Sequence, residues 1–360
     1  MDLAPTLRLL LLAGAIALLP LAWLWWRQRR ADAHGRMAAL VALTLFLTFD
    51  LIVFGAFTRL SDSGLGCPDW PGCYGHASPL GAAADIRAAQ SAMPTGPVTF
   101  SKAWVEMIHR YLAMTVGALI VVMTIAAWLR RRALPLSPWW ATATLVWVLV
   151  QGLFGALTVT WKLNPAIVTL HLLGGMLLLA LLAVQYQWLR PRPLGWPAWA
   201  RGLVIGVSAL LVVQIALGAW VSSNYAVLAC NGFPQCNGAW WPPMDFREGF
   251  TFRRALGRDG DGDFLPFEAL VAIHMAHRLF AVLATLALLL LAHVLWHRLA
   301  QRREALGLLG LLLLQLLSGL SNVVLGWPLL AALAHTAGAA LLVALLSVLW
   351  ARSAPPRSHS

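Results

Sequence analysis

Hydrophobic residues gather into nine long stretches along the chain, separated by polar and basic segments. An α-helix rises 1.5 Å per residue, so a helix of about 20 apolar residues crosses the hydrocarbon core of a bilayer. Each stretch reaches about this length, which predicts an all-α integral membrane protein with about nine transmembrane helices. The stretches lie near residues 7–26, 38–58, 104–128, 139–160, 166–189, 201–223, 267–296, 303–325 and 329–351.

The composition agrees with a membrane protein. Of the 360 residues, 60% are hydrophobic and only 11% are charged, whereas about 25% charged residues is usual for soluble domains. This composition excludes a soluble enzyme, a disordered chain and a small secreted disulfide protein. The chain carries 26 Lys and Arg against 14 Asp and Glu, a net charge of +12. Because the arginines lie in short tracts between apolar stretches and not on one polar surface, we expect no nucleic-acid partner.

The basic tracts fall on alternate connections between the stretches, so they share one face of the membrane. Under the positive-inside rule this face is the cytoplasm, which places the N-terminus outside and the C-terminus inside. In the first stretch the positive charges follow the apolar run and no small-residue cleavage site is present, so we expect a retained helix and not a signal peptide. The tracts lie at residues 27–36, 130–132, 190–201, 298–303 and 352–357.

The second half of the chain repeats the first at an offset near 165 residues, which indicates an internal duplication. The offset predicts an extra N-terminal helix with a basic loop (1–37), followed by two tandem pseudo-symmetric four-helix bundles (38–195 and 196–360). Both bundles would share one orientation and be related by an axis along the membrane normal. The matched pairs are Cys67 with Cys230, Gly55 with Gly218, His109 with His277, His171 with His335, Gln151 with Gln315, and Gly155 with Gly319.

Four histidines lie inside predicted spans, where an ionisable side chain is costly and indicates function. His109 and His171 belong to the first bundle, and His277 and His335 belong to the second. Two histidines at one depth on non-adjacent helices suit bis-axial ligation of a heme iron. Imidazole also binds copper and zinc, and a core histidine bonded to a neighbouring helix is the plain alternative. Equal depth for all four histidines requires the seventh stretch to begin nearer residue 271.

The two bundles differ one helical turn before their first histidine, where one has Glu106 and the other has His274. A carboxylate beside a buried pocket can act as a base, a proton relay or a cation stabiliser. We therefore predict Glu106 as the catalytic residue, with the reacting group in the first bundle and a cofactor in the second. Arg110 and Arg278 follow the same histidines. They could bind an acidic edge such as a heme propionate or extend to the lipid headgroups.

Two connections, near residues 59–103 and 224–266, are long and rich in Gly and Pro, and each carries two cysteines with five residues between them. Both connections fall on the outer face, where disulfides persist, and this spacing is unusual for a zinc site. We expect two local disulfides, Cys67–Cys73 and Cys230–Cys236, that fix each connection as a cap. A redox role for these cysteines stays open.

Several of these segments together are similar to one protein family. The segments are the run from Arg59 to Cys73 (RLSDSGLGCPDWPGC), Glu106-Met-Ile-His109-Arg110, Thr169-Leu-His171 and His277-Arg278. The chain resembles heme A synthase over about residues 38–351. The resemblance implies oxidation of heme O to heme A for cytochrome oxidase, in which the C8 methyl group becomes a formyl group by way of a hydroxymethyl stage.

The resemblance also implies roles for the histidines and for Glu106. A heme b cofactor would be held by His277 and His335, the substrate heme O would bind at His109 and His171, and Glu106 would take part in the oxidation. Heme O would come from a heme O synthase, and no motif identifies the electron acceptor. The protein would lie in a bacterial inner membrane, in contact with lipid, with its cysteine connections in the periplasm, and it could form a homo-oligomer.

Two other functions fit the same residues. One is a two-heme membrane electron-transfer cytochrome without substrate chemistry, and the other is a quinone-linked oxidase that generates disulfides. The contrast between Glu106 and His274 favours the enzyme over the cytochrome, because electron transfer alone needs no such asymmetry. The disulfide-generating oxidase predicts exchangeable cysteines and no heme.

Overall fold

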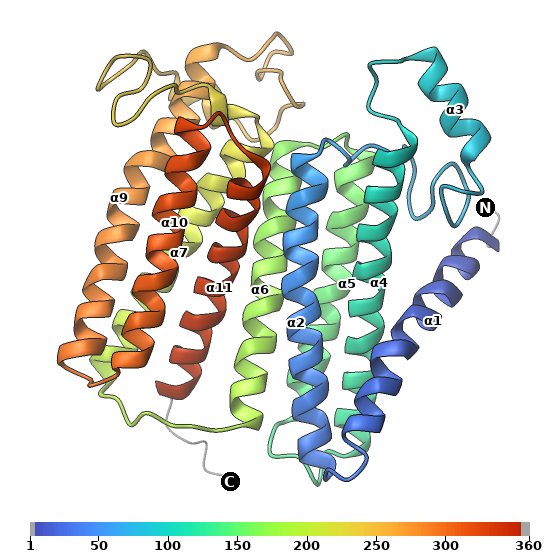
Figure 1. Cartoon of the computed structure of the whole chain (residues 1–360), viewed down its shortest axis with the longest axis vertical. Coiled ribbons are helices and arrows are strands. Elements are labelled where there is room, and N and C mark those ends of the chain that lie inside the picture. The colour runs from blue at the N-terminus through green and yellow to red at the C-terminus, as the bar shows by residue number, and fades with distance from the viewer. Residues whose placement is uncertain (1–3, 354–360) are drawn as a thin grey trace. The chain divides into compact units, whose positions relative to one another are not determined.

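The computed structural model describes residues 4–353, and every named element in that range is helical (Figure 1). The elements are α1 (Ala4–Arg27), α2 (Ala33–Leu60), α3 (Ala83–Ala92), α4 (Phe100–Leu129), α5 (Pro138–Thr160), α6 (Pro165–Leu189), α7 (Ala198–Ser223), the 3-10 turn η1 (Ala226–Leu228), α8 (Phe246–Gly249), α9 (Phe267–His297), α10 (Arg302–Val324) and α11 (Leu329–Ser353).

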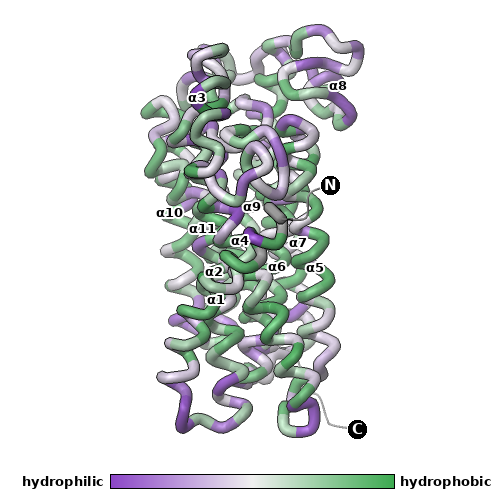
Figure 2. Tube along the Cα trace, turned by 90° about the vertical axis from the view of Figure 1, so that its right-hand side faces the viewer, coloured by the Kyte–Doolittle hydropathy of each residue, from purple (hydrophilic) through white to green (hydrophobic). Residues whose placement is uncertain are grey.

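Nine helices within residues 4–353 are long and apolar enough to cross a membrane, which confirms the predicted all-α membrane fold. They are α1, α2, α4, α5, α6, α7, α9, α10 and α11. Hydropathy along the trace shows the same division, with apolar residues along the helices and hydrophilic residues concentrated in the connections (Figure 2).

Polar caps extend two of these helices beyond the apolar stretches that predicted them. The carboxylate of Asp32 accepts a hydrogen bond from the Gly35 amide, and α2 begins at Ala33 instead of near residue 38. The hydroxyl of Thr99 accepts one from the Lys102 amide, and α4 begins at Phe100 instead of near residue 104. An N-cap side chain satisfies backbone amides that have no partner within the helix, so the helix can start in polar sequence.

The chain forms two compact units. Unit 1 comprises residues up to 163 together with 177–191, and unit 2 comprises residues 164–176 together with those from 192 onward. The first turns of α6, which carry His171, therefore belong to unit 2. The bundle boundaries expected from the internal repeat, 38–195 and 196–360, stay a prediction.

In unit 1, α4 is the central helix and packs against α1, α2 and α5. The apolar core between these helices includes Met37, Leu119, Ile120 and Met123. The extra N-terminal helix α1 thus packs on the four-helix region through α4 and α2.

Unit 2 contains a closed ring of four helices. In this part of the described chain α7 packs against α9, α9 against α10, α10 against α11, and α11 against α7. α9 and α11 share no such contact within the described residues, so they lie on one diagonal of the ring, and α7 and α10 lie on the other. This arrangement places His277 and His335, which α9 and α11 carry, on opposite helices of one bundle.

Candidate functional site

The four intramembrane histidines form two matched pairs by their position along their helices. His109 follows the start of α4 at Phe100 by nine residues, and His277 follows the start of α9 at Phe267 by ten. His171 and His335 each follow their helix start by six residues. The seventh span begins at Phe267, as the apolar stretch predicted, and the later start near 271 is not needed for equal depth, because α4 begins earlier than expected.

Three of the histidine rings lie directly against a glycine of a neighbouring helix. A Cβ atom built on Gly55 of α2 would lie 3.0 Å from Cε1 of His109. The corresponding distance is 2.9 Å from Gly218 of α7 to His277, and 3.1 Å from Gly319 of α10 to His335. These distances are too short for a side chain without displacing the ring, so each glycine forms a seat for an imidazole. The repeat offset had already matched Gly55 with Gly218, but only the structure shows what these glycines do.

The rings of His277 and His335, both in unit 2, also have a hydrogen-bond partner at Nδ1. Ser318 Oγ of α10 lies 3.0 Å from Nδ1 of His335, and Gln214 Nε2 of α7 lies 3.1 Å from Nδ1 of His277. With Nδ1 engaged, Nε2 is the ring atom left for a metal, and at His277 the Gln214 amide also lies 3.5 Å from Nε2. Sequence reasoning missed Ser318 and assigned no role to Gln214.

The first pair of histidines is held differently. Phe54 stacks on the His109 ring, with ring centroids 6.4 Å apart and planes at 10°. The buried Nδ1 of His171 has no hydrogen-bond partner among the described residues. His109 belongs to unit 1 and His171 to unit 2, so their pairing at one site stays a prediction.

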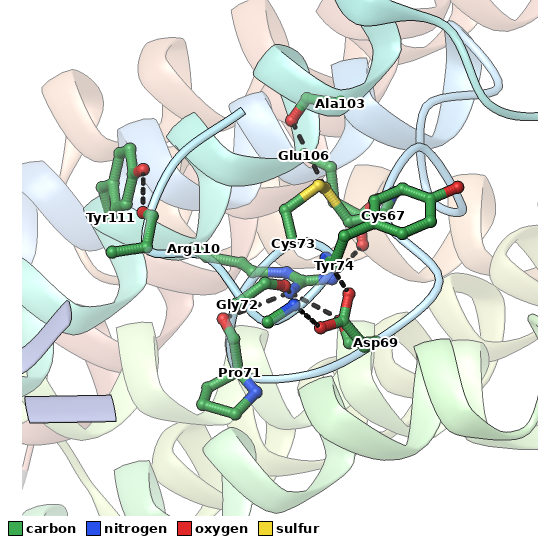
Figure 3. The surroundings of a disulfide bond; sticks show 12 residues. Cys67, Asp69, Pro71, Gly72, Cys73, Tyr74, Ala103, Glu106, Arg110 and Tyr111 are labelled. Carbon is green, nitrogen blue, oxygen red and sulfur yellow. Dashed lines mark hydrogen bonds and ion pairs between the residues drawn. A yellow bond between two sulfur atoms is a disulfide. The ribbon is translucent and has the colours of Figure 1, made fainter. Parts of the chain in front are cut away.

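Glu106 is buried beneath the first cysteine loop, which we define as residues 61–99, and both of its oxygens are engaged (Figure 3). The Cys67 amide donates to Oε2 at 2.8 Å. Arg110, one turn further along α4, donates to Oε1 and forms an ion pair with it. The carboxylate is only 4% exposed, so it lies away from solvent and is linked directly to the backbone of the disulfide loop.

Arg110 also holds the first cysteine loop by its carbonyl groups. Its Nη1 donates to the carbonyl oxygens of Asp69 at 2.9 Å, Pro71 at 3.2 Å and Gly72 at 2.5 Å (Figure 3). The sequence predicted a propionate or headgroup contact for this guanidinium. In the structure it satisfies backbone acceptors and the Glu106 carboxylate, and a propionate contact stays a prediction.

The second cysteine loop, which we define as residues 224–266, is held by Arg278 in the same way. Arg278 donates to the carbonyl oxygens of Cys230 at 2.9 Å, Gly232 at 3.0 Å and Gln235 at 3.3 Å. Gly232 and Gln235 stand 163 residues after Asp69 and Gly72, so the two arginines contact matched carbonyl groups. Both loops also contain a short antiparallel bridge at matched positions, Cys73 with His76 and Cys236 with Ala239.

All four cysteines are in disulfides. Cys67 pairs with Cys73 and Cys230 with Cys236, with Cα atoms 4.9 and 4.8 Å apart. These are the two local bridges that the spacing indicated. Each closes the part of the loop whose carbonyl groups face Arg110 or Arg278.

His274, the counterpart of Glu106, is also buried but has a different partner. Its Nδ1 donates to the Ala226 carbonyl at 2.9 Å, in η1 and not in the disulfide segment. The two units therefore differ in chemistry at this position, as the sequence indicates. In unit 1 a carboxylate paired with Arg110 contacts the first cysteine loop, and in unit 2 an imidazole bonded to the Ala226 carbonyl contacts η1.

Arg254 is a buried residue of the second cysteine loop that sequence reasoning missed. It donates to Asn224 Oδ1 at 2.5 Å, and its guanidinium lies 5.7 Å from the centre of the Trp220 ring. Its own carbonyl accepts a hydrogen bond from Asn164 at 3.0 Å. Burial lowers the pKa of its guanidinium from the usual value. The available signal was an arginine in a connection that the sequence predicts to lie on the outer face, against the positive-inside rule.

Comparison with known proteins places this chain in a family. The sequence model of a family described as cytochrome oxidase assembly protein matches residues 38–347. The chain belongs to this family. The match covers all four histidines, both disulfides and Glu106, and it leaves out the extra helix α1.

Three relatives of this chain carry the name Heme A synthase. A protein of Shewanella oneidensis named Heme A synthase is 40% identical over 309 residues, which is 84% of this chain and 92% of the relative. Proteins of the same name from Sphingopyxis alaskensis and Rhizorhabdus wittichii are 31% and 29% identical. They cover 87% and 89% of this chain, and 91% and 94% of their own lengths.

The donor atoms of unit 2 fit a heme iron. His277 and His335 offer two imidazoles on diagonal helices of one bundle, each seated on a glycine and each held at Nδ1. No group of three or more His, Cys, Asp or Glu side chains that could hold a metal is present within residues 4–353. Two axial imidazoles are sufficient for heme, because the porphyrin itself supplies the four equatorial ligands.

Proposed function

We propose that this protein is a heme A synthase-type oxidoreductase that serves cytochrome oxidase biogenesis. It converts heme O to heme A by oxidising the C8 methyl group to a formyl group, through a hydroxymethyl stage. The observation that carries the proposal is the match to the Shewanella oneidensis Heme A synthase, 40% identical over 84% of this chain. The proposal is also supported by histidine rings that pack directly against a glycine of a neighbouring helix in both units.

The cofactor in this proposal is a heme b held by His277 and His335. When bound, it supplies a one-electron carrier within the membrane. The support lies in the diagonal placement of the two helices and in the Nδ1 contacts with Gln214 and Ser318. Arg278 has a buried Nε without a partner among the described residues, which leaves one donor for a propionate.

The substrate heme O binds through His109 and His171 in this proposal. Glu106 lies one turn before His109 on α4, so its carboxylate and that imidazole share one face of the helix. Oxidation of the methyl group releases protons, and Glu106 is the buried carboxylate of unit 1 nearest along the chain to the substrate ligand. Its ion pair with Arg110 gives it a second role, since substitution of either residue also disturbs the first cysteine loop.

The sidedness and partners of the protein complete the proposal. The basic connections lie in the cytoplasm of a bacterial inner membrane, and both cysteine loops lie in the periplasm. A heme O synthase in the same membrane supplies the substrate, which is too apolar to diffuse through water. Association of copies of this chain into a homo-oligomer is part of the proposal and can be measured by the mass of the purified complex.

The test is pigment analysis of cells that make heme O but not heme A. Expression of this chain should produce heme A in extracts analysed by liquid chromatography and mass spectrometry, with heme b copurifying with the protein. Bound heme b without any heme A would instead support the two-heme cytochrome. Purified protein without a heme spectrum, and with cysteines that exchange with added thiols, would support the disulfide-generating oxidase.

A further inference from the structure

We propose that Ser318 and Gln214 are positioning residues that fix the two imidazoles of the resident heme in the tautomer that binds iron. The inference rests on the proposed function for the identity of the heme. It concerns the part of the site that lies behind the ligands, where an acceptor at Nδ1 orients a coordinating histidine and raises its basicity.

The hydrogen bonds of Ser318 determine the direction of its contact with His335. Its hydroxyl donates to the Leu314 carbonyl at 2.6 Å, with the Gln315 carbonyl at 3.3 Å as a second acceptor. A hydroxyl has one hydrogen, which is thus already used on the helix backbone. The 3.0 Å contact with Nδ1 of His335 must then run from the ring N–H to the Ser318 oxygen. Nε2 is left with a free lone pair, the form that an iron ligand requires.

Gln214 can do the same for His277. The Gln214 side chain lies 3.1 Å from Nδ1 of His277, and its buried Oε1 has no hydrogen-bond partner among the described residues. A half-turn of the amide exchanges its oxygen and nitrogen, two atoms whose assignment rests on the hydrogen bonds that they make. Oε1 then accepts from the ring N–H, and this orientation gives up the 3.4 Å contact between Nε2 of the amide and the His277 carbonyl. With the amide in this orientation, both His277 and His335 have an acceptor behind the ring.

The first half of the chain does not repeat the Ser318 contact. The offset of 164 residues that relates His171 to His335 matches Ser318 with Phe154, which cannot accept a hydrogen bond. The buried Nδ1 of His171 accordingly has no partner among the described residues. A substrate heme must leave after reaction, whereas a cofactor must stay. A fixed, more basic imidazole suits the cofactor, and an imidazole without an acceptor suits the exchangeable substrate.

The experiment compares Ser318→Val with Ser318→Thr and with Ser321→Val in the full-length protein purified in detergent. Ser321 is a matched control, because its hydroxyl also donates to the carbonyl four residues earlier on α10, that of Leu317, at 2.8 Å. The readouts are heme b per chain, the rate at which heme transfers to excess apomyoglobin, and the midpoint potential of the bound heme. Gln214→Leu and its conservative partner Gln214→Glu test the second histidine in the same assays.

We expect Ser318→Val to speed heme loss by about 10- to 100-fold, the usual effect of removing a partner behind a metal ligand. The midpoint potential should rise, because an imidazole without an acceptor donates less charge to iron. Ser318→Thr should restore both values, and Ser321→Val should match the unchanged protein. Equal heme loss and potential in Ser318→Val and the unchanged protein would overturn the inference, and so would equal effects of the two valine variants.

The test separates this inference from the proposed function. If the unchanged protein retains heme b but makes no heme A, the proposed function fails and the Ser318 comparison is still decisive. If Ser318→Val loses its fold, as judged by gel filtration, Gln214→Leu decides in its place. An unchanged protein that binds no heme at all would overturn both proposals.

Discussion

Gly218 of α7 lies so close to His277 of α9 that an added Cβ atom would stand 2.9 Å from Cε1 of the ring. The glycine is needed for space and not for backbone freedom, since it lies within a regular helix. Any larger residue would push the imidazole away from its position and from Gln214, which contacts the same ring at Nδ1.

Substitution Gly218→Val should therefore reduce heme b bound per chain at least several-fold. Gly206 lies on the same helix with no atom within 4 Å of an added Cβ, so Gly206→Val is the matched control and should retain full heme. Helix propensity cannot explain a difference between the two, because both exchange glycine for valine within one helix. Heme is measured from the pyridine hemochrome spectrum. Equal losses of heme in both variants would contradict the role of Gly218 in leaving space for the His277 ring.

Glu106→Gln should lower the rate of heme A formation by about 100-fold or more, within the range for loss of a general base or acid. Glutamine can still accept from the Cys67 amide but cannot form the ion pair with Arg110. Heme b should remain bound, because His277 and His335 are unchanged. The measurement is heme A formed per unit of protein, with the heme b spectrum of the same sample.

A matched variant, Glu304→Gln, breaks another glutamate–arginine contact, the 2.7 Å pair with Arg352. It should leave heme A formation within about twofold of the unchanged protein. If Glu106→Gln loses heme b as well, the division of roles between the two halves of the chain is wrong.

Much of the fold could be predicted from the sequence, because an apolar stretch of bilayer length has few alternatives to a spanning helix. The nine spans follow from this, and their ends deviate where polar caps such as Asp32 and Thr99 start a helix outside the apolar stretch. The histidines could be identified because an ionisable residue is conspicuous among leucines. Gly55 and Gly218 could be found as repeat markers, but their role as seats depends on the distance between two helices.

The contacts of Arg110 and Ser318 could not be predicted, for two different physical reasons. Arg110 reaches carbonyl groups of the first cysteine loop, and the path of such an irregular loop is not encoded by any periodicity. Ser318 has the ordinary appearance of a serine whose hydroxyl bonds to the preceding helical turn. Only the packing of α11 against α10 brings the His335 ring to a lone pair of the Ser318 hydroxyl oxygen.

The sidedness of the protein can be tested by labelling introduced cysteines, because all four native cysteines are in disulfides. Leu80 is an exposed residue of the first cysteine loop, and Leu80→Cys should react with a membrane-impermeant maleimide in intact spheroplasts. Ala133 lies in the basic connection between α4 and α5, and Ala133→Cys should react only after the membrane is opened. The opposite pattern would contradict the periplasmic location of the cysteine loops.

Arg110→Lys should loosen the first cysteine loop and lower heme A formation together. A guanidinium reaches the Asp69, Pro71 and Gly72 carbonyl groups and the Glu106 carboxylate at once. An ammonium group is a compact charge that cannot span these acceptors. Protease cleavage within residues 61–99 should accelerate several-fold, as measured by the masses of the fragments.

Two further lysine variants distinguish a specific effect from a general one. Arg87→Lys changes an exposed arginine of α3 in the same loop and should alter neither cleavage nor activity. Arg278→Lys releases the matched carbonyl groups of the second loop, so it should accelerate cleavage within residues 224–266 and leave cleavage of the first loop unchanged. Because Glu106 pairs with Arg110 and its counterpart His274 bonds to η1 instead, only Arg110→Lys releases a carboxylate at the substrate side. A loss of activity in Arg278→Lys as large as that in Arg110→Lys, with heme b retained in both, would show that the ion pair with Glu106 is not what makes Arg110 important.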